Sequence, residues 1–334
     1  MKSLIAPLMN KIPYIKRLQQ HIAEVSRERD ELWDKLAELN KRIEDLRERE
    51  GGFPAGHYYS PVPDREDVLA YLKARKARDK NPAGISVDRQ GMLDLLEEYG
   101  RFYEDIPFPE TQAEGFRYYF DNEWYSYGDA IFLHSFLRKH QPEHIIEVGS
   151  GFSSAVMLDT VDRFFPQRPE MTFIDPYPER LQGLLTDDDR KQVNVIAKKI
   201  QNVPVDLFAS LKAGDLLFID SSHVVKAGSD LQFLLFEILP LLPPGVFVHF
   251  HDMFWPFDYP SSWLEKGMYW NENYFLHAFL INNQEWSIQF FNSYTKHEFI
   301  GFVNEKMPLC AKNFGGGLYL RKEVCESAQS AKDC

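Results

Sequence analysis

Polar residues and glycines follow four short apolar stretches between residues 145 and 252, where such stretches would end as β-strands. Carboxylates and imidazoles in these positions can bind a ligand or transfer a proton. Ligands of open α/β sheets bind outside the carboxyl ends of the strands, so these residues are expected to share one site. They are Glu147, Gly149, Gly151, Asp175, Asp220, His223, His251 and Asp252.

The stretch "IIEVGSGFSS" at residues 145–154 predicts a buried strand, a glycine turn and a helix. Such a turn brings backbone N–H groups against a nucleotide-like ligand. Asp175 follows Gly151 at a distance where an acid can accept hydrogen bonds from ribose hydroxyls. The third glycine of a dinucleotide fingerprint is absent, and no GKS or GKT triplet is present. The pattern favours a ligand with an adenosine and no pyrophosphate.

His223 is the candidate general base, because an imidazole with an ordinary pKa of about 6.5 can take up a proton near neutral pH. It lies three residues beyond Asp220 and can reach the same pocket. The alternative is a histidine that caps a helix or packs in the core.

Strands of nearly continuous apolar residues alternate with helical segments between residues 144 and 252, which is typical of a parallel sheet covered on both faces. The tail adds "WSIQFFNSY" and a last strand near "GGGLYLRK". The fold class predicted is α/β: a doubly wound, Rossmann-like, mostly parallel seven-stranded sheet with an antiparallel edge strand.

A heptad pattern precedes this sheet, between residues 15 and 46. Ile and Leu at most core positions predict a parallel dimeric coiled coil, in which Arg29 could fix the register. A long amphipathic helix lying on its own domain is the alternative. One core position holds Ile15, Ile22, Arg29, Leu36 and Ile43, and the other holds Leu18, Val25, Leu32, Leu39 and Leu46.

Gly51 and Gly52 are expected to end this helix, and the segment containing Tyr58 and Tyr59 is expected to pack on the next domain or cover the site. The predicted domains are a coiled-coil helix, a linker with a helical cap or lid, a catalytic domain and a tail. Their ranges are 1–50, 51–140, 141–322 and 323–334.

The composition narrows the compartment and the partners. A net charge of −12 and a pI near 5.4 disfavour nucleic acid. The cysteines, Cys310, Cys325 and Cys334, lack the spacing of a disulfide framework or a zinc site, so a cytoplasmic location is expected. The absence of an apolar run of about 18 residues predicts no membrane span.

Four stretches together resemble the class I S-adenosylmethionine-dependent methyltransferases, in the branch with bacterial small-molecule and sugar O-methyltransferases. They are "IIEVGSGFSSAVMLDT", "MTFIDPYPERL", "GDLLFIDSSHVVKAGSD" and "GVFVHFHDMFWP", and the resemblance spans about residues 55–322. It implies S-adenosyl-L-methionine as cofactor, with the adenine near Gln201 and Asn202. The cofactor-binding residues that it implies are Glu147, Gly149, Ser150, Gly151, Ser153, Asp175, Asp220, Ser126 and Asp129. For Asp129, capping of the following helix is an equal alternative.

The resemblance also implies a divalent ion, such as Mg²⁺, at the ends of the fourth and fifth strands, held by Asp220 and Asp252. His251 stands where relatives often have an acid, and imidazole suits softer ions than Mg²⁺. Metal dependence and metal independence therefore both stay open. His249 shares the strand face of His251, where packing is its more ordinary role.

An aromatic and polar segment after the fifth strand is expected to bind the methyl acceptor. Its residues are Trp255, Asp258, Tyr259, Trp263, Trp270 and Glu272. A dimer interface or a lid without substrate contact is the alternative.

The function predicted is O-methylation of a hydroxyl on a saccharide or other small molecule, with His223 and Asp220 as catalytic residues and a homodimer formed through residues 15–46. The alternatives are an assembly protein that binds the cofactor without catalysis, and an NAD-dependent oxidoreductase.

Overall fold

The computed structural model describes residues 13–49, 53–75 and 81–324. The chain divides into two compact units, Met1–Ala74 and Arg75–Cys334. Gly51 and Gly52, Cys325 and Cys334 lie outside the described residues, as does nearly all of the predicted tail. Cys310 is a buried free thiol.

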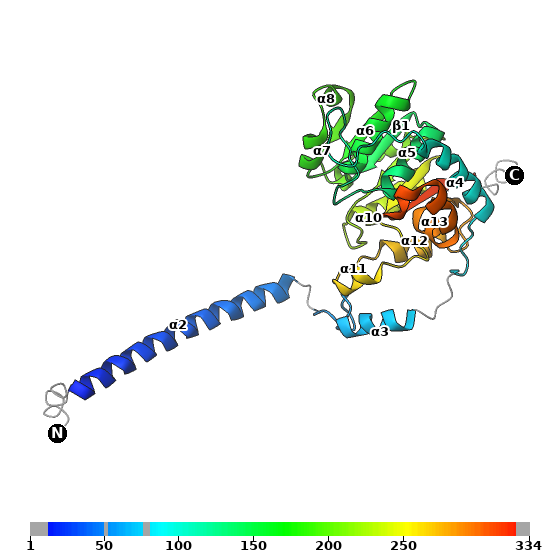
Figure 1. The fold of residues 1–334 in the computed structure, drawn as a ribbon. Coiled ribbons are helices and arrows are strands. Elements are labelled where there is room, and N and C mark those ends of the chain that lie inside the picture. Colours follow the sequence, from blue (N-terminus) through cyan, green and yellow to red (C-terminus); the bar gives the residue numbers. More distant parts are fainter. Residues whose placement is uncertain (1–12, 50–52, 76–80, 325–334) are drawn as a thin grey trace. The chain divides into compact units, whose positions relative to one another are not determined.

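The first unit contains the long helix α2 (Pro13–Arg49) and most of α3 (Arg65–Arg75), drawn in blue and cyan in Figure 1. The apolar heptad residues from Leu18 to Ile43 are between 46% and 65% exposed. The side chain of Leu46 lies outside the description. A stripe of this length keeps a large apolar surface in water unless a partner covers it.

The second unit is built on a sheet whose strand order, within the described residues, is β3-β2-β1-β4-β5-β7-β6. The first five strands are parallel, and β7 pairs antiparallel with both β5 and β6. The strands are β1 (His144–Val148), β2 (Glu170–Ile174), β3 (Asn194–Ile196), β4 (Leu216–Ile219), β5 (Phe247–His251), β6 (Trp286–Phe291) and β7 (Gly317–Lys322). The predicted doubly wound, Rossmann-like sheet is confirmed, with β7 second from the edge.

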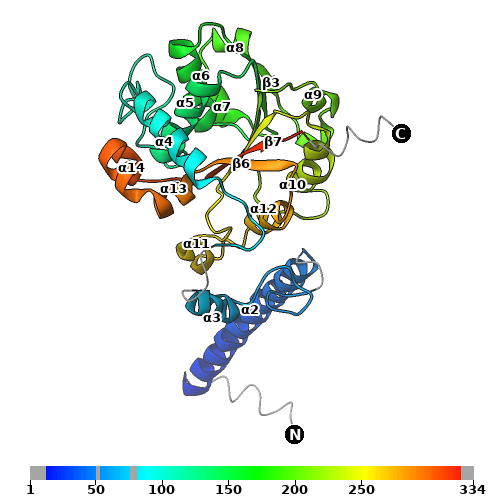
Figure 2. The ribbon, with the colours of Figure 1, turned by 90° about the vertical axis from the view of Figure 1, so that its right-hand side faces the viewer.

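Helices cover both faces of this sheet, as Figure 2 shows: α4, α5 and α6 lie on one face and α9 and α10 on the other. Their bounds are α4 (Arg89–Tyr103), α5 (Gly128–His140), α6 (Phe152–Phe164), α7 (Glu179–Leu184), α8 (Asp189–Gln192), η1 (Ile200–Asn202), α9 (Asp206–Ala209), α10 (Asp230–Phe233), η2 (Leu234–Ile238), η3 (Leu239–Leu241), α11 (Ser261–Glu265), α12 (Glu272–Leu280), α13 (Asn292–Glu298), α14 (Ile300–Lys306) and η4 (Pro308–Ala311).

The strands are apolar because both of their faces are covered. Ile145, Phe173, Leu217 and Phe250 are fully buried, and burial of such side chains contributes about 1.5–3 kcal/mol each. The strand order reverses between β1 and β4, where parallel sheets of this kind bind their ligands. Among the described helices, none has both the length and the apolar character needed to cross a membrane.

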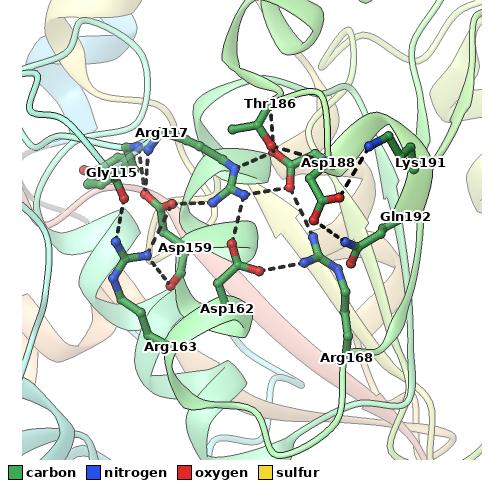
Figure 3. Close-up of polar contacts among 12 residues, drawn as sticks. Gly115, Arg117, Asp159, Asp162, Arg163, Arg168, Thr186, Asp188, Lys191 and Gln192 are labelled. Atoms are coloured by element: carbon green, nitrogen blue, oxygen red, sulfur yellow. Dashed lines mark hydrogen bonds and ion pairs between the residues drawn. The ribbon is translucent and has the colours of Figure 1, made fainter.

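A buried ion-pair network fixes the segment that precedes α5, as Figure 3 shows. The Arg117 guanidinium lies 2.8 Å from Asp159 Oδ1, 2.8 Å from Asp162 Oδ2 and 2.6 Å from Asp189 Oδ1. The backbone N–H groups of Arg117 and Tyr118 also donate to Asp159. Burial opposes ionisation of Asp189, but the hydrogen bonds from Arg117 lower the pKa of that carboxyl to about 2. The network therefore joins this segment to α6 and to the start of α8.

Candidate active site

The glycine turn after β1 brings two strand ends into direct contact. Gly149 has a φ of +81°, and a Cβ atom at this position would lie 1.7 Å from the carbonyl oxygen of Asp220. The Gly149 N–H donates to Ile174 O at 2.9 Å, and the Asp220 N–H donates to Val148 O at 2.8 Å. Only glycine fits this position, because any side chain would collide with the Asp220 backbone. The close contact between the ends of β1, β2 and β4 therefore depends on Gly149.

Glu147 lies fully buried below this turn and interacts with the hydroxyls of Ser153 and Ser154 at the start of α6. Burial raises the pKa of the Glu147 carboxyl to about 8, although both hydroxyls oppose the shift. Burial therefore favours the neutral form of this carboxyl, which ties β1 to the first turn of α6.

Glu147→Gln is expected to change the pH dependence of stability. A carboxyl whose pKa rises on folding stabilises the protein below its unfolded pKa of 4.5, and this contribution is lost as the pH rises through about 8. Glutamine cannot ionise, so the variant should gain stability relative to the wild type between those limits. Urea unfolding at pH values of about 5 and about 8.5 measures this difference. The exposed Glu143→Gln variant is the control, and an identical Glu147→Gln difference at both pH values would contradict the assignment.

A cavity of about 440 Å³ opens at the carboxyl ends of β1, β2 and β4. Asp175 lies on its wall and accepts hydrogen bonds from the backbone N–H groups of Ser150 at 3.0 Å and Tyr177 at 2.7 Å. Predicted residues on the wall include Gly149, Asp175, Gln201 and Asp220, whereas Lys199, Ser221, Ser222, Lys226, Ser229 and Asp230 are residues that the sequence did not single out. Most of these unpredicted wall residues belong to "SSHVVKAGSD" after β4. Their position directly after a predicted strand could have identified them in the sequence.

Gln201 has a fixed orientation in this cavity. Its side-chain N–H donates to Gly228 O at 2.8 Å, and its buried Oε1 accepts no hydrogen bond from the described residues. An unpaired buried acceptor costs about 1–3 kcal/mol, so a ligand that donates to Oε1 would recover this energy.

A second group of side chains surrounds His223, which has a φ of +58°. His223 Nδ1 lies 2.8 Å from Glu272 Oε2, and Nε2 lies 3.4 Å from Asp220 Oδ1 and 3.6 Å from Asp252 Oδ2. The ring of Trp270 stacks on the imidazole at 4.4 Å. The predicted catalytic residues Asp220 and His223 are therefore neighbours, and Glu272 is buried against His223.

This environment favours the imidazolium form of His223. Burial opposes the charge, but the hydrogen bonds to Asp220 and Glu272 raise the pKa of the ring to about 11. Burial also opposes a charge on His251, yet the carboxylates of Asp220, Asp252 and Asp129 raise its pKa. A ring that already carries its proton donates hydrogen bonds and stabilises negative charge, and it accepts no further proton.

The predicted metal ligands, Asp220, Asp252 and His251, lie in the cluster around His223. In the part of the chain that the structure describes, no three His, Cys, Asp or Glu side chains are arranged to hold an ion. His223 Nε2 points between Asp220 and Asp252, and His251 Nε2 lies 3.7 Å from Asp252 Oδ1. This set of donors does not fit Mg²⁺, which requires oxygen ligands in octahedral geometry.

Asp129 and Ser126 lie at the start of α5. The Asp129 carboxylate accepts hydrogen bonds from the Gly316 N–H at 3.0 Å and from Asn292 Nδ2 at 3.3 Å, and Asn313 Nδ2 donates to Ser126 Oγ. Burial raises the pKa of Asp129 to about 6. The carboxylate thus bonds to the turn before β7, whereas a helix cap would bond to the first turn of α5.

The aromatic segment after β5 divides into wall and core. Trp255 and Asp258 line a second cavity, while Tyr259 is fully buried. Trp263 and Trp270 pack together at 5.3 Å and both contact the Tyr259 ring. His249, predicted to pack, stacks on Phe218 at 4.1 Å.

The family described as a methyltransferase domain matches residues 146–253. An uncharacterized protein of Archaeoglobus fulgidus is 30% identical over 166 residues, which cover 48% of this chain and 74% of that protein. The matched residues 146–253 include β2 to β5 and most of β1, the strands that carry the site.

Two solved structures are similar over most of the chain. The SAH-bound methyltransferase PaMTH1 of Podospora anserina is 15% identical, with a TM-score of 0.38 and coverage of 79% of this chain and 99% of that chain. The O-methyltransferase TomG of Streptomyces achromogenes, in complex with SAM, is 12% identical, with a TM-score of 0.35 and coverage of 79% and 100%.

Proposed function

Since the chain belongs to the class I S-adenosylmethionine-dependent methyltransferases, we propose that it methylates a hydroxyl oxygen of a saccharide or other small molecule. The observation that carries the proposal is the cavity at the glycine turn, where Gly149, Asp175, Gln201 and Asp220 come together.

In this proposal the cavity holds S-adenosylmethionine, which supplies the methyl group on its sulfonium. Asp175, fixed by the N–H groups of Ser150 and Tyr177, accepts hydrogen bonds from the ribose hydroxyls. Gln201 Oε1 accepts a hydrogen bond from the adenine amino group. Gly149, Ser150 and Gly151 contact the methionine part, and Glu147 and Ser153 support them from below.

Methyl transfer to a hydroxyl requires alignment of the two reactants and removal of one proton. We assign the role of general base, which removes the proton of the acceptor hydroxyl, to Asp252. This carboxylate borders the cluster, whereas His223 already holds its own proton between three carboxylates. His223 and His251 then stabilise the negative charge that develops on the acceptor oxygen. The sequence suggested His223 as the base. To act as a base, its ring would first have to lose the proton that the hydrogen bonds to Asp220 and Glu272 stabilise on it.

Transfer of a labelled methyl group tests the proposed function. The protein is incubated with S-adenosylmethionine labelled at the methyl group and a panel of hydroxylated sugars and phenols, each beside its deoxy analogue and its amino analogue. Label in the hydroxylated members alone supports O-methylation. Label in amines alone, or in no acceptor while the cofactor binds, would overturn it, and the second result would favour the assembly-protein alternative.

The exposed stripe of α2 supports a parallel dimer formed through residues 15–46. Leu32 and Leu39 are successive residues at one heptad core position. Replacing both by lysine should place charges in the dimer interface and leave monomers, which sedimentation velocity measures. A variant with serine at Asp34 and Lys41, on the opposite face, is the control and should stay dimeric. Equal masses for both variants would contradict the dimer, and methyl transfer per chain should survive in the single chains.

A further inference from the structure

A second cavity of about 530 Å³ lies beside the catalytic cluster, and it shares no wall residue with the cofactor cavity. Its wall comes from four segments: Arg75 at the end of α3, the loop after β5, α13 and the turn before β7. The residues used below are Trp255, Asp258, Lys296, Phe314 and Gly315.

Two consecutive glycines, Gly315 and Gly316, bring this cavity close to the carboxylate of Asp129 and the backbone of Asp252. A Cβ atom at Gly315, which has a φ of +68°, would lie 1.8 Å from Asp129 Oδ1. A Cβ atom at Gly316 would lie 3.0 Å from the Cα atom of Asp252 and 2.8 Å from the Phe254 ring. Gly315 and Gly316 thus leave room for Asp129 and Asp252 to approach the wall.

The wall combines aromatic rings with a lysine that has no acidic partner among the described residues. The charge of Asp258 is balanced by Arg75 at 3.1 Å. Lys296 Nζ lies 5.5 Å from the centroid of the Phe314 ring, and no carboxylate of the described residues lies within ion-pair distance of it. In a chain with a net charge of −12, a lysine in this position is available for a negative group of a ligand.

We propose that this cavity binds the methyl acceptor and that the acceptor is a hydroxylated ring bearing a carboxylate. The ring lies against Trp255 and Phe314, the carboxylate pairs with Lys296, and the hydroxyl faces Asp252. This inference rests on the proposed function, because it assigns the substrate class of the same site.

Matched acid and neutral acceptors test the proposal. The pairs are D-glucuronate with D-glucose, and 3,4-dihydroxybenzoate with catechol, so that a sugar acid and a phenolic acid are distinguished. For at least one pair the acid should show a kcat/KM about tenfold higher than its neutral partner, as expected for one charge-assisted hydrogen bond. Lys296→Gln should remove this preference and leave the neutral partner within about twofold, because glutamine keeps hydrogen bonding and loses only the charge.

The control is Lys306→Gln, because Lys306 pairs with Glu305 outside the cavity and its loss should leave the preference unchanged. Equal kcat/KM for acid and neutral partners would overturn the proposal, as would a preference that survives in Lys296→Gln. If no acceptor is methylated, saturation-transfer NMR of the S-adenosylhomocysteine complex tests binding of the two acids instead. Failure of both D-glucuronate and 3,4-dihydroxybenzoate to bind would overturn the proposal. Calorimetry with the cofactor separates this failure from that of the proposed function, since Lys296→Gln should bind S-adenosylmethionine as the wild type does.

Discussion

Replacement of Asp252 by asparagine is expected to lower kcat by about 10²–10⁴-fold, the usual contribution of a general base. Asparagine has the size of aspartate and can bond to His223 and His251, but it cannot take a proton from a hydroxyl. His223 Nε2 and His251 Nε2 lie 3.6 Å and 3.7 Å from this carboxylate, so the geometry of the cluster should persist. Burial raises the pKa of Asp252, which makes its carboxylate a stronger base than an exposed aspartate.

Steady-state kinetics with a turned-over acceptor measure this loss, and calorimetry should show cofactor affinity within about twofold of the wild type, because the cofactor cavity does not include Asp252. Asp121→Asn, at an exposed position, is the control. A rate within about threefold of the wild type would exclude Asp252 as the base. A large loss in His223→Gln with an unchanged rate in Asp252→Asn would return that role to His223.

Arg117→Met is expected to destabilise the second unit by about 3–5 kcal/mol, because it leaves buried carboxylates without their cation. Asp159 is fully buried and Asp189 nearly so. For a unit of this size the loss corresponds to a fall in Tm of roughly 6–20 °C. Methionine preserves most of the side-chain volume, so the loss reports the charge.

Thermal unfolding followed by circular dichroism measures the Arg117 effect. Arg190→Met is the matched control, since its ion pair with Asp187 is exposed and should contribute no more than about 1 kcal/mol. A loss below about 1 kcal/mol in Arg117→Met would show that the network does not hold the segment before α5.

The sheet was predictable because each parallel strand is a short apolar run that ends in polar residues, and the alternation with helices fixes their direction. The glycine turn and Asp175 were predictable for a related reason, since backbone constraints at Gly149 appear directly as a residue type. The position of β7 between β5 and β6 was not predictable. In the chain β6 comes before β7, and only the strand pairing in the folded sheet places β7 next to β5.

The rest of the site depends on contacts between residues that are far apart in the chain, so the sequence did not predict it. Glu272 looked like part of an acceptor wall, yet it pairs with His223, 49 residues away, and so changes the protonation expected for that histidine. Arg117 showed no pattern in the sequence, because its carboxylates lie on α6 and at the start of α8. Tyr259 resembled Trp255 in the sequence, and only packing placed one in the core and the other on a cavity wall.

Isothermal titration calorimetry with S-adenosylmethionine tests the central claim most directly, with S-adenosylhomocysteine as the product and Asp175→Ala as the variant. We expect both ligands to bind the wild type with micromolar affinity, one per chain. The variant should lose about tenfold or more, because Asp175 accepts a hydrogen bond from the glycine turn and, in the proposed complex, contacts the ribose. Absence of binding to the folded wild-type protein would contradict the account, and unchanged affinity in Asp175→Ala would show that the cofactor does not bind in this cavity.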